Sequence, residues 1–468
     1  MNLRVLSIEL RRSVALWAGA LILTTALAFL YPVDAPWWKG TTAWTAQWTS
    51  MALWSRSLLF YLWPLAVGLG ALQGMRDHRS KMSELLTSTP RPARHRAATM
   101  AGTMGFTVAL AFALLMLVGA VRVLPNVAYT HFGWLPISLV GALFLVAGTV
   151  LGMGAGRALP SALTPPAVAM GAFVFTALMY MSLGRTETTT QAGFASSEPN
   201  RLSLLSPMVE EVRDVFVTLS TSVHVGQTIW LLGMVTTGFA LLVAATPRAR
   251  LIALAPLLAG AAAALLVFPS DPRLMYVVDE NAAVPVCDGP VCVTNTEQGR
   301  LAALAGPGKK ALRLLNGALG DQAPVSVREN TAVLPNGSMP RWSRETVLFD
   351  FDDDVIATAQ GEELTRAVIA KAMVPGCTPV GWDGSGQWGD AFAQTIAVGW
   401  VLGDLKPLPG TAPASLVRSP RGETPQVFWK KFKALPRAEQ LSRMQALRAA
   451  AISCKDDWAD ALEGGASR

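Results

Sequence analysis

The stretch Leu135–Gly156 reads LPISLVGALFLVAGTVLGMGAG and contains no charged side chain. About 20 consecutive apolar residues are enough for a helix to cross the hydrocarbon core of a bilayer. The composition points the same way, because 51% of the 468 residues are hydrophobic and only 15% are charged. Soluble proteins average about 25% charged residues. The stretch therefore predicts one membrane-spanning helix of an α-helical, polytopic membrane protein.

Small residues recur at every fourth position of this predicted helix, at Gly148, Gly152 and Gly156. Gly70 and Gly74 repeat the same spacing in another apolar segment. Such small-xxx-small faces let two helix backbones approach closely in a membrane. The spacing predicts close helix packing, and it leaves open whether the contact joins two subunits or two helices of one chain.

Seven segments are long and apolar enough to span a membrane. They contain no Asp, Glu, Lys or His, whereas ion-coupled carriers usually keep ionisable residues at membrane depth. We therefore expect the driving energy of any transport to come from elsewhere. The first segment could be mistaken for a signal peptide, but six further spans favour a retained helix. The predicted spans are Val14–Leu30, Leu58–Met75, Ala98–Val121, Leu135–Gly156, Ala167–Leu183, Ile229–Ala245 and Leu251–Phe268.

The loops between these spans predict the orientation, because Lys and Arg are enriched on the cytoplasmic side. The alternate pieces 1–13, 76–97, 157–166 and 246–250 hold 12 Lys/Arg in 50 residues. The pieces between them hold 6 in 84, counted over 32–57, 122–134 and 184–228. We expect a plasma-membrane protein with its N-terminus in the cytoplasm. Seven crossings then place residues 270–468 outside the cell.

All four cysteines fall in this last part, at Cys287, Cys292, Cys377 and Cys454. An even number confined to one domain predicts two disulfides in an oxidising compartment. A Cys287–Cys292 bond would close a local turn, and a Cys377–Cys454 bond would tie the chain end to the domain, but spacing does not decide the connectivity. The alternative is four free thiols in a cytosolic domain.

Residues 270–468 predict an extracytoplasmic α+β domain. Val284–Val293 has the pattern of two strands joined by an Asp-Gly-Pro turn. Further strands are expected at Thr346–Phe351 and Val355–Thr358. A helix over Glu297–Leu319 is expected to be interrupted near Gly306–Gly308. The other expected helices are Glu362–Met373, Trp388–Leu402, Gln426–Leu435 and Arg437–Leu462.

No catalytic, cofactor or metal site is predicted in this domain. It contains no histidine, which excludes His-based zinc sites and Ser-His or Cys-His nucleophiles within it. The acidic run Asp350–Asp354 is better explained as a solvated turn than as a calcium site. Gly381–Trp388 is better explained as an ordinary loop than as a sugar-stacking site. Gly306–Lys310 lacks the spacing of a phosphate loop, so no ATP site is expected in the chain.

The densest basic stretch is Arg76–Arg96, RDHRSKMSELLTSTPRPARHR, with six Lys/Arg and two His. Basic residues confined to short loops between apolar spans argue against nucleic-acid binding. Met82, Leu85 and Leu86 share one face of a short helix that Pro90 ends. A helix this short needs a surface to pack on. That surface is either anionic membrane lipid, as for any positive-inside loop, or a groove in a protein.

The loop resembles the coupling helix of type-2 ABC exporter permeases, where Glu-Leu-Leu precedes small residues and a proline. Here those residues are Glu84, Leu85 and Leu86, followed by Thr87–Thr89 and Pro90. The layout is also similar: an amphipathic connecting helix at 1–13, then a six-span permease core at 14–245 with the coupling helix at about 79–90. The chain departs from the family in its seventh span, 251–268, and its outer domain, 270–468.

The resemblance implies a separate cytoplasmic ABC ATPase that holds ATP and Mg, and a homodimer or heterodimer of permeases. The residues expected to contact the ATPase are Met82, Glu84, Leu85, Leu86, Thr89 and Pro90. The chain itself is then a non-catalytic transport subunit, most simply of an exporter. The alternative is a membrane-anchored receptor or scaffold whose outer domain binds a ligand or partner protein. A membrane enzyme is disfavoured because no catalytic constellation is present.

Overall fold

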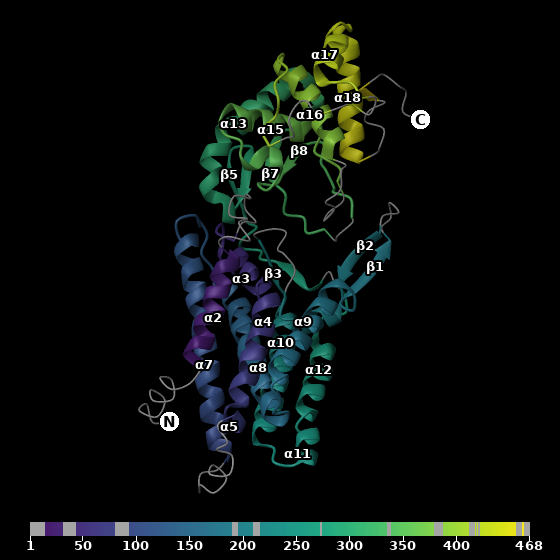
Figure 1. Cartoon of the computed structure of the whole chain (residues 1–468). Coiled ribbons are helices and arrows are strands. Elements are labelled where there is room, and N and C mark those ends of the chain that lie inside the picture. The colour runs from purple at the N-terminus through teal and green to yellow at the C-terminus, as the bar shows by residue number, and fades with distance from the viewer. Residues whose placement is uncertain are drawn as a thin grey trace.

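The computed structural model consists of a helical bundle with a C-terminal domain stacked on one of its ends (Figure 1). It describes residues 15–30, 44–79, 93–189, 195–208, 216–271, 274–334, 338–378, 387–410, 417, 419, 422–454 and 461–462. The predicted connecting helix at 1–13 lies outside these residues.

The bundle contains helices that are able to span a membrane, as the sequence predicts. Within the described residues, five helices are long and apolar enough, or up to six if the bent pair α3–α4 is one span. Helix α2 is shorter, at 14 residues. The bundle helices are α2 (Ala15–Ala28), α3 (Trp48–Ser57), α4 (Leu59–Gly74), α5 (Arg76–Arg79), α7 (Ala93–Val123), α8 (Trp134–Ala158), α9 (Thr164–Met181), α10 (Thr221–Val243), α11 (Pro247–Ile252) and α12 (Ala255–Val267).

The region before α4 differs from the expected outer loop at 32–57. Its second half is helix α3, which meets α4 at a bend of 52°. Trp44 and Trp48 are buried in the bundle. The Trp48 ring stacks on that of Trp134, with centroids 5.5 Å apart. The large apolar surface of these rings fills the space beside α8.

Short strands connect the bundle to the C-terminal domain. Strands β1 (Arg185–Thr189) and β2 (Ala195–Pro199) form an antiparallel hairpin, followed by the 3-10 helix η3 (Arg201–Leu205). Strand β3 (Val217–Leu219) pairs with β4 (Tyr276–Val278), which follows the last bundle helix. In the sequence, Met208, Val212, Val215, Phe216 and Leu219 have the spacing of one helix face, which predicts an amphipathic surface helix here. Its middle, 209–215, lies outside the described residues, and its end is the strand β3.

The C-terminal domain has a mixed four-stranded sheet in the order β5-β6-β7-β8, in which β6, β7 and β8 are parallel. Helix α13 crosses between β6 and β7, as a parallel connection requires. The elements are β5 (Pro285–Asp288), β6 (Val291–Thr294), η5 (Asn295–Glu297), α13 (Gln298–Leu319), η6 (Gly320–Gln322), β7 (Ser326–Glu329), β8 (Thr346–Phe349), α14 (Asp354–Ala357), α15 (Glu362–Met373), α16 (Gln387–Leu402), α17 (Pro425–Lys433) and α18 (Arg437–Ser453).

Several boundaries in this domain correct the sequence-based expectations. Helix α13 runs unbroken through Gly306–Gly308, because Gly308 lets it pack on the Val291 side chain of β6. The expected strand at 355–358 is helix α14, whose first turn is capped by Asp353 accepting from Val355 N at 3.2 Å. Strand β7 was not predicted, and α18 ends at Ser453, well before Leu462.

Both predicted disulfides are present. Cys287 and Cys292 face each other across the β5–β6 hairpin, with Cα atoms 4.1 Å apart. Cys377 and Cys454 lie 77 residues apart in sequence and 5.3 Å apart at Cα. The described cysteines include no free thiol. The second bond fastens the end of α18 to the segment after α15.

Candidate functional site

The predicted ATPase-coupling residues fall in 80–92, which lies outside the described residues. The structure therefore gives no position for Met82, Glu84, Leu85, Leu86, Thr89 or Pro90. It does describe both flanks of the loop, since α5 follows directly on α4 and α7 begins at Ala93. These flanks lie at the end of the bundle opposite the C-terminal domain (Figure 1).

This far end of the bundle carries basic side chains. Arg76 and Arg79 are exposed on α5, and Arg157 occupies the last turn of α8. Arg250 of α11 reaches across to donate from Nη1 to the Ala158 carbonyl at 2.9 Å. Cations at helix C-termini are favourable because they oppose the partial negative charge of the last carbonyls. The end surface around the loop is thus positively charged.

The sequence-predicted glycines of α8 pack directly against α4. A Cβ added to Gly152 would lie 2.0 Å from the Val67 carbonyl oxygen, and one on Gly156 would lie 2.2 Å from that of Ala71. Gly148 differs, because a Cβ there would meet the side chain of Trp63, 2.5 Å from its indole nitrogen. No side chain larger than hydrogen fits at Gly152 and Gly156, so the two backbones touch along about two turns of α8. The contact lies within one chain.

Glycines of α4 contribute to the same contact, and the α4–α8 contact at these glycines is called the glycine seam below. A Cβ on Gly70 would lie 2.1 Å from the Thr149 carbonyl oxygen, and one on Gly74 would lie equally close to that of Met153. The opposite face of α8 repeats the arrangement with α10, where Gly238 meets the Val150 carbonyl. Helices α4, α8 and α10 therefore form one closely packed layer.

Arg56 is the most unusual side chain of the bundle, because it is fully buried in the last turn of α3. Its guanidinium donates to the Pro207 carbonyl from both Nε and Nη2, each at 3.2 Å. Nη2 also donates to Gln227 Oε1 at 3.2 Å, and Nη1 lies 3.5 Å from the Ile137 carbonyl. The cation lies over the Phe144 ring, 5.3 Å from its centroid.

Neutral acceptors alone surround this cation in the part of the chain that the structure describes, where no carboxylate lies within 4 Å of Arg56. Gly141 makes room for it, since a Cβ there would lie 2.9 Å from Arg56 Cδ. Gln227 is held in turn by donating to the Leu204 carbonyl at 3.1 Å. Burial of a charge is costly, and ionisable residues within membrane-spanning bundles mark functional positions.

The Arg56 cluster was not predicted from the sequence, for two reasons. Arg56 was assigned to an outer loop, because a charge ends an apolar run. The sixth span was started at Ile229, whereas α10 begins at Thr221 and so includes His224 and Gln227. The expectation that the spans contain no histidine therefore fails for α10. An arginine beside an apolar run, with a helix-compatible sequence on both sides, was the available signal.

A second polar cluster lies at the carboxyl ends of the parallel strands of the C-terminal domain. Burial raises the pKa of Glu297 to about 8 and that of Glu329 to about 7. Glu329 accepts from the Thr294 amide at 2.6 Å. Arg300 lies 3.8 Å from Glu297 and stacks over the Phe351 ring. This is the edge at which open parallel sheets bind ligands.

The acidic run Asp350–Asp354 is built into the domain and is not the expected solvated turn. Burial raises the pKa of Asp350 to about 6. Asp353 caps α14 and forms an ion pair with the buried Lys371. Within the described residues, no group of three His, Cys, Asp or Glu side chains is arranged to hold a metal ion. The loop at 381–386 lies outside those residues.

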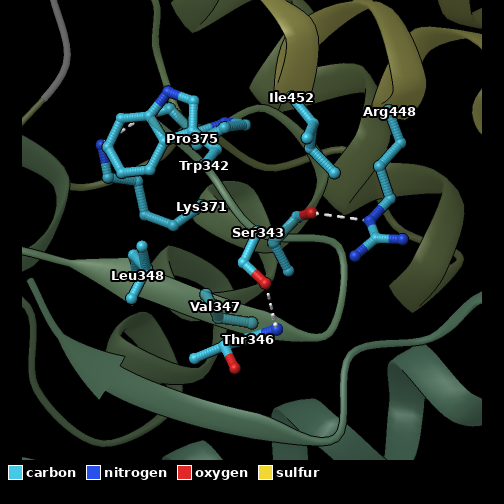
Figure 2. A pocket seen from close by; sticks show the side chains of 10 residues that line it. Trp342, Ser343, Thr346, Val347, Leu348, Lys371, Pro375, Arg448 and Ile452 are labelled. Atoms are coloured by element: carbon cyan, nitrogen blue, oxygen red, sulfur yellow. Dashed lines mark hydrogen bonds between the residues drawn. The ribbon is translucent and has the colours of Figure 1, made fainter. Parts of the chain in front are cut away.

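The pocket in Figure 2 lies beside β8, between the Trp342 segment and α18. Its two cationic side chains, Arg448 and Lys371, are hydrogen-bonded to backbone carbonyls of the domain. Arg448 donates to the carbonyls of Ala372, Gln322 and Arg344, at 2.5–3.0 Å. Lys371 donates to the Pro375 carbonyl at 2.7 Å. The cations of the pocket therefore have a structural role: they link the segments around it, next to the Cys377–Cys454 disulfide.

Comparison with known proteins found no matching family model, no matching curated protein and no matching solved structure. The function proposed for this chain therefore depends on its own residues and geometry.

Proposed function

We propose that this chain is the transmembrane permease subunit of an ATP-driven ABC transporter, most simply an exporter, in the plasma membrane. Its N-terminus would be cytoplasmic and its C-terminal domain extracytoplasmic. The observation that supports this most is the position of the two segments that flank the basic loop in sequence. Helix α5 and the start of α7 lie at the end of the bundle opposite the C-terminal domain (Figure 1). The resemblance of Glu84–Pro90 to a coupling helix implies that the partner is a cytoplasmic ABC ATPase.

Helix α4 is the element through which force on this loop would act. It begins two residues after Ser57 and ends two residues before Arg76, so it runs from the Arg56 cluster to the basic helix α5. Its 16 residues span about 24 Å. Because the glycine seam leaves no slack between α4 and α8, a push on the loop would move both helices together. The displacement would then reach the bonds between Arg56, Pro207 and Gln227.

A separate cytoplasmic ATPase would supply ATP and Mg, and a second permease copy, identical or related, would complete the pathway. The chain offers apolar surface for such a partner or for lipid. Met170 of α9 and Leu258 and Leu266 of α12 are all largely exposed. Exposed apolar faces of this kind belong in the bilayer or at a helix–helix interface.

The test is permease-dependent ATP turnover by the co-purified ATPase in proteoliposomes. Glu84→Lys and Leu85→Asp should each lower the stimulated rate by about tenfold or more, the effect of losing about 1.4 kcal/mol of contact. Glu198→Lys on β2 is the matched control, because it reverses a carboxylate at the other end of the bundle. Thermal unfolding of all three variants should be unchanged. A tag at residue 85 reachable only from outside the cell would overturn the proposal, as would purified protein with no nucleotide-hydrolysing partner.

The second candidate function is a membrane-anchored receptor or scaffold. It is favoured by the polar cluster of Glu297, Glu329 and Arg300 at the carboxyl ends of β6 and β7, where a ligand would bind. This function predicts that Glu84→Lys and Leu85→Asp leave activity intact. It also predicts that Glu297→Gln abolishes ligand binding by the purified chain without any ATPase present.

A further inference from the structure

The start of α3 is connected to the C-terminal domain in two places, once directly and once through a histidine. Gln47, which precedes α3, is 4% exposed and donates from Nε2 to the Thr296 carbonyl at 2.8 Å. In the first turn of α3, Thr49 Oγ1 lies 3.0 Å from His131 Nε2. Helix α3 lies at the end of the bundle that faces the domain (Figure 1). Its last turn carries Arg56, so one ten-residue helix connects the domain to the buried cation.

The second connection depends on Asp279 of the domain. Its Oδ2 lies 3.5 Å from His131 Nε2, and the two side chains are 22% and 14% exposed. The backbone fixes this carboxylate, since the Asp279 amide donates to the Phe216 carbonyl at 2.8 Å. Its Oδ1 accepts from the Asn281 amide at 3.1 Å. The imidazole of His131 thus contacts α3 on one side and a carboxylate of the domain on the other.

The strength of this contact depends on one proton. A carboxylate only accepts hydrogen bonds, so Nε2 of His131 carries the hydrogen of the neutral ring and a second proton goes to Nδ1. Nδ1 is buried and has no hydrogen-bond partner within the described residues. Histidine is the side chain that changes charge between pH 5 and 8. Protonation therefore turns a neutral contact into an ion pair, and partial burial makes the attraction stronger than in bulk water.

The neighbouring groups on the same two loops do not supply this change. Tyr129 packs edge-on against the imidazole, with ring centroids 5.2 Å apart. Burial and the Asp279 carboxylate raise the pKa of Tyr129, so it stays neutral from pH 5 to 8. Glu280 is exposed next to Asp279 and adds a second negative charge.

The start of α13 brings two further charges to the junction. A Cβ on Gly299 would lie 3.7 Å from that of Ala128, on the loop that carries His131. Glu297 and Arg300 flank this glycine, 3.8 Å apart. Burial raises the pKa of Glu297 to about 8, so this carboxyl also releases its proton near neutral pH. The two responses have the same direction and must be separated by experiment.

We propose that His131 is a pH-sensitive latch between the C-terminal domain and α3, closed when the imidazole is protonated and looser when it is neutral. In the orientation proposed above, His131 lies outside the cell, so the latch responds to external acidity. That orientation is part of the proposed function, whereas the latch itself needs no ATPase. The closed latch holds the start of α3 against the domain, and α3 carries Arg56 at its other end.

The test measures the distance from domain to bundle by double electron–electron resonance, on the purified full-length chain in nanodiscs at pH 5.5 and 7.5. Spin labels are attached to Leu124→Cys, after α7, and Lys310→Cys on α13, which are both exposed. A Glu297→Gln background removes the other titrating carboxyl. The distance should be short and narrowly distributed at pH 5.5. At pH 7.5 the population at longer distances should rise about fivefold, the effect of losing an ion pair of about 1 kcal/mol.

Substitutions of the latch should fix its state. His131→Gln should show the longer distances at both pH values, because the amide is neutral at both. His131→Lys should keep the short distance at both, because the ammonium stays charged opposite Asp279. Asp279→Asn should remove the pH response. His78→Gln is the matched control, since His78 is exposed on α5 at the other end of the bundle, and it should keep the full response.

A pH response that persists in His131→Gln or in Asp279→Asn would overturn the latch. Loss of the response in the Glu297→Gln background alone would also overturn it, because Glu297 would then be the sensor. Circular dichroism shows whether each variant is folded. If His131→Gln is not, His131→Lys decides, and a pH-dependent distance in that variant contradicts the proposal. Absence of an ATPase partner would contradict the proposed function and leave these distances unchanged.

Discussion

Arg56 shows how one residue can connect parts of the chain that are far apart in sequence. It lies 81 residues from Ile137, 151 from Pro207 and 171 from Gln227, and it bonds to all three. Its charge is stabilised by carbonyl dipoles, an amide oxygen and the Phe144 ring, and not by a carboxylate in the described residues. This arrangement depends on the conformation of the bundle, because each acceptor must point toward the Arg56 guanidinium. It is a natural place for two conformations of the bundle to differ.

Arg56→Met should release the Ser206–Met208 segment from α3. Two hydrogen bonds to Pro207 are lost, and bonds to charged groups contribute about 1.5–3 kcal/mol each. An engineered Ser206→Cys, buried in the parent, should then react with maleimide at least about tenfold faster. Arg56→Lys should give an intermediate rate, since an ammonium cannot make the forked contact. Arg122→Met is the control, and equal rates in it and in Arg56→Met would contradict this role.

Glu297 should make the C-terminal domain less stable as pH rises. Burial raises its pKa to about 8, whereas an unfolded chain releases this proton near pH 4.3. Between these values the folded state binds more protons than the unfolded state, so the free energy of unfolding falls by up to about 1.4 kcal/mol per pH unit. Thermal unfolding from pH 5 to 8 should show this slope. Glu297→Gln should make the slope shallower, leaving the part due to the raised pKa values of Glu329 and Asp350, and the exposed Glu363→Gln should leave it unchanged. An unchanged slope in Glu297→Gln would be the contrary result.

At the scale of elements, the α4–α8 seam sets how the bundle can move. Four glycines, Gly70, Gly74, Gly152 and Gly156, bring the two backbones into contact, and α8 meets α10 in the same way through Gly154 and Gly238. Because the backbones of α4, α8 and α10 are in direct contact, no helix can shift or rotate without displacing its neighbour. We therefore expect the three helices to move as a unit. Helix α5 and the Arg56 cluster lie at the two ends of α4.

Gly152→Ala should destabilise the bundle by about 1–3 kcal/mol, the usual cost of overpacking. The added methyl group would overlap the Val67 carbonyl, which as backbone of α4 cannot move away alone. Gly171→Ala on α9 is the matched control, because nothing lies within 4 Å of a Cβ there. It should be neutral or stabilising by about 0.4–1 kcal/mol. The measurement is thermal unfolding in detergent, and equal melting temperatures for the two variants would refute the seam.

Element prediction succeeded where periodicity was strong and failed where tertiary contacts decided. The bounds of α15 agree with the expected helix at both ends, and β5 and β6 lie within the expected hairpin. Val355–Thr358 has strand-like residues but follows the capping carboxylate of Asp353, which starts a helix. Strand β7 is short and polar, and only its pairing between β6 and β8 makes it a strand. The glycine spacing did predict a close contact, but not its partner helix.

At the scale of the whole molecule, two disulfides cross-link the C-terminal domain internally. The β3–β4 strand pair attaches the domain to the bundle. The β3–β4 ladder is reinforced by the Ser220 amide, which donates to the Met275 carbonyl at 2.9 Å. Gln47, just before α3, donates to the Thr296 carbonyl at 2.8 Å. His131 lies 3.5 Å from Asp279 across the same junction. The domain therefore contacts the bundle close to both α3 and α10.

Removing the two disulfides should have unequal effects on the domain. In the chain-entropy model the Cys377–Cys454 loop contributes about 4–5 kcal/mol and the Cys287–Cys292 loop about 2 kcal/mol. The Cys377→Ser/Cys454→Ser variant of the full chain should therefore be the more sensitive to limited proteolysis under mild heating. The Cys287→Ser/Cys292→Ser variant serves as its matched control. Equal sensitivity would show that the long loop is already ordered when the bond is absent.

The sequence by itself determined that this is a helical membrane protein with a mixed C-terminal domain and two disulfides, because apolar length, charge and cysteine count are local properties of the chain. It also suggested the basic loop as the coupling element, which stays a prediction. Only the tertiary structure decided that the glycines pack α4 on α8, that Arg56 is buried, and that His131 meets both Thr49 and Asp279. Each of these depends on which distant segments meet, and one-dimensional periodicity carries no information on that.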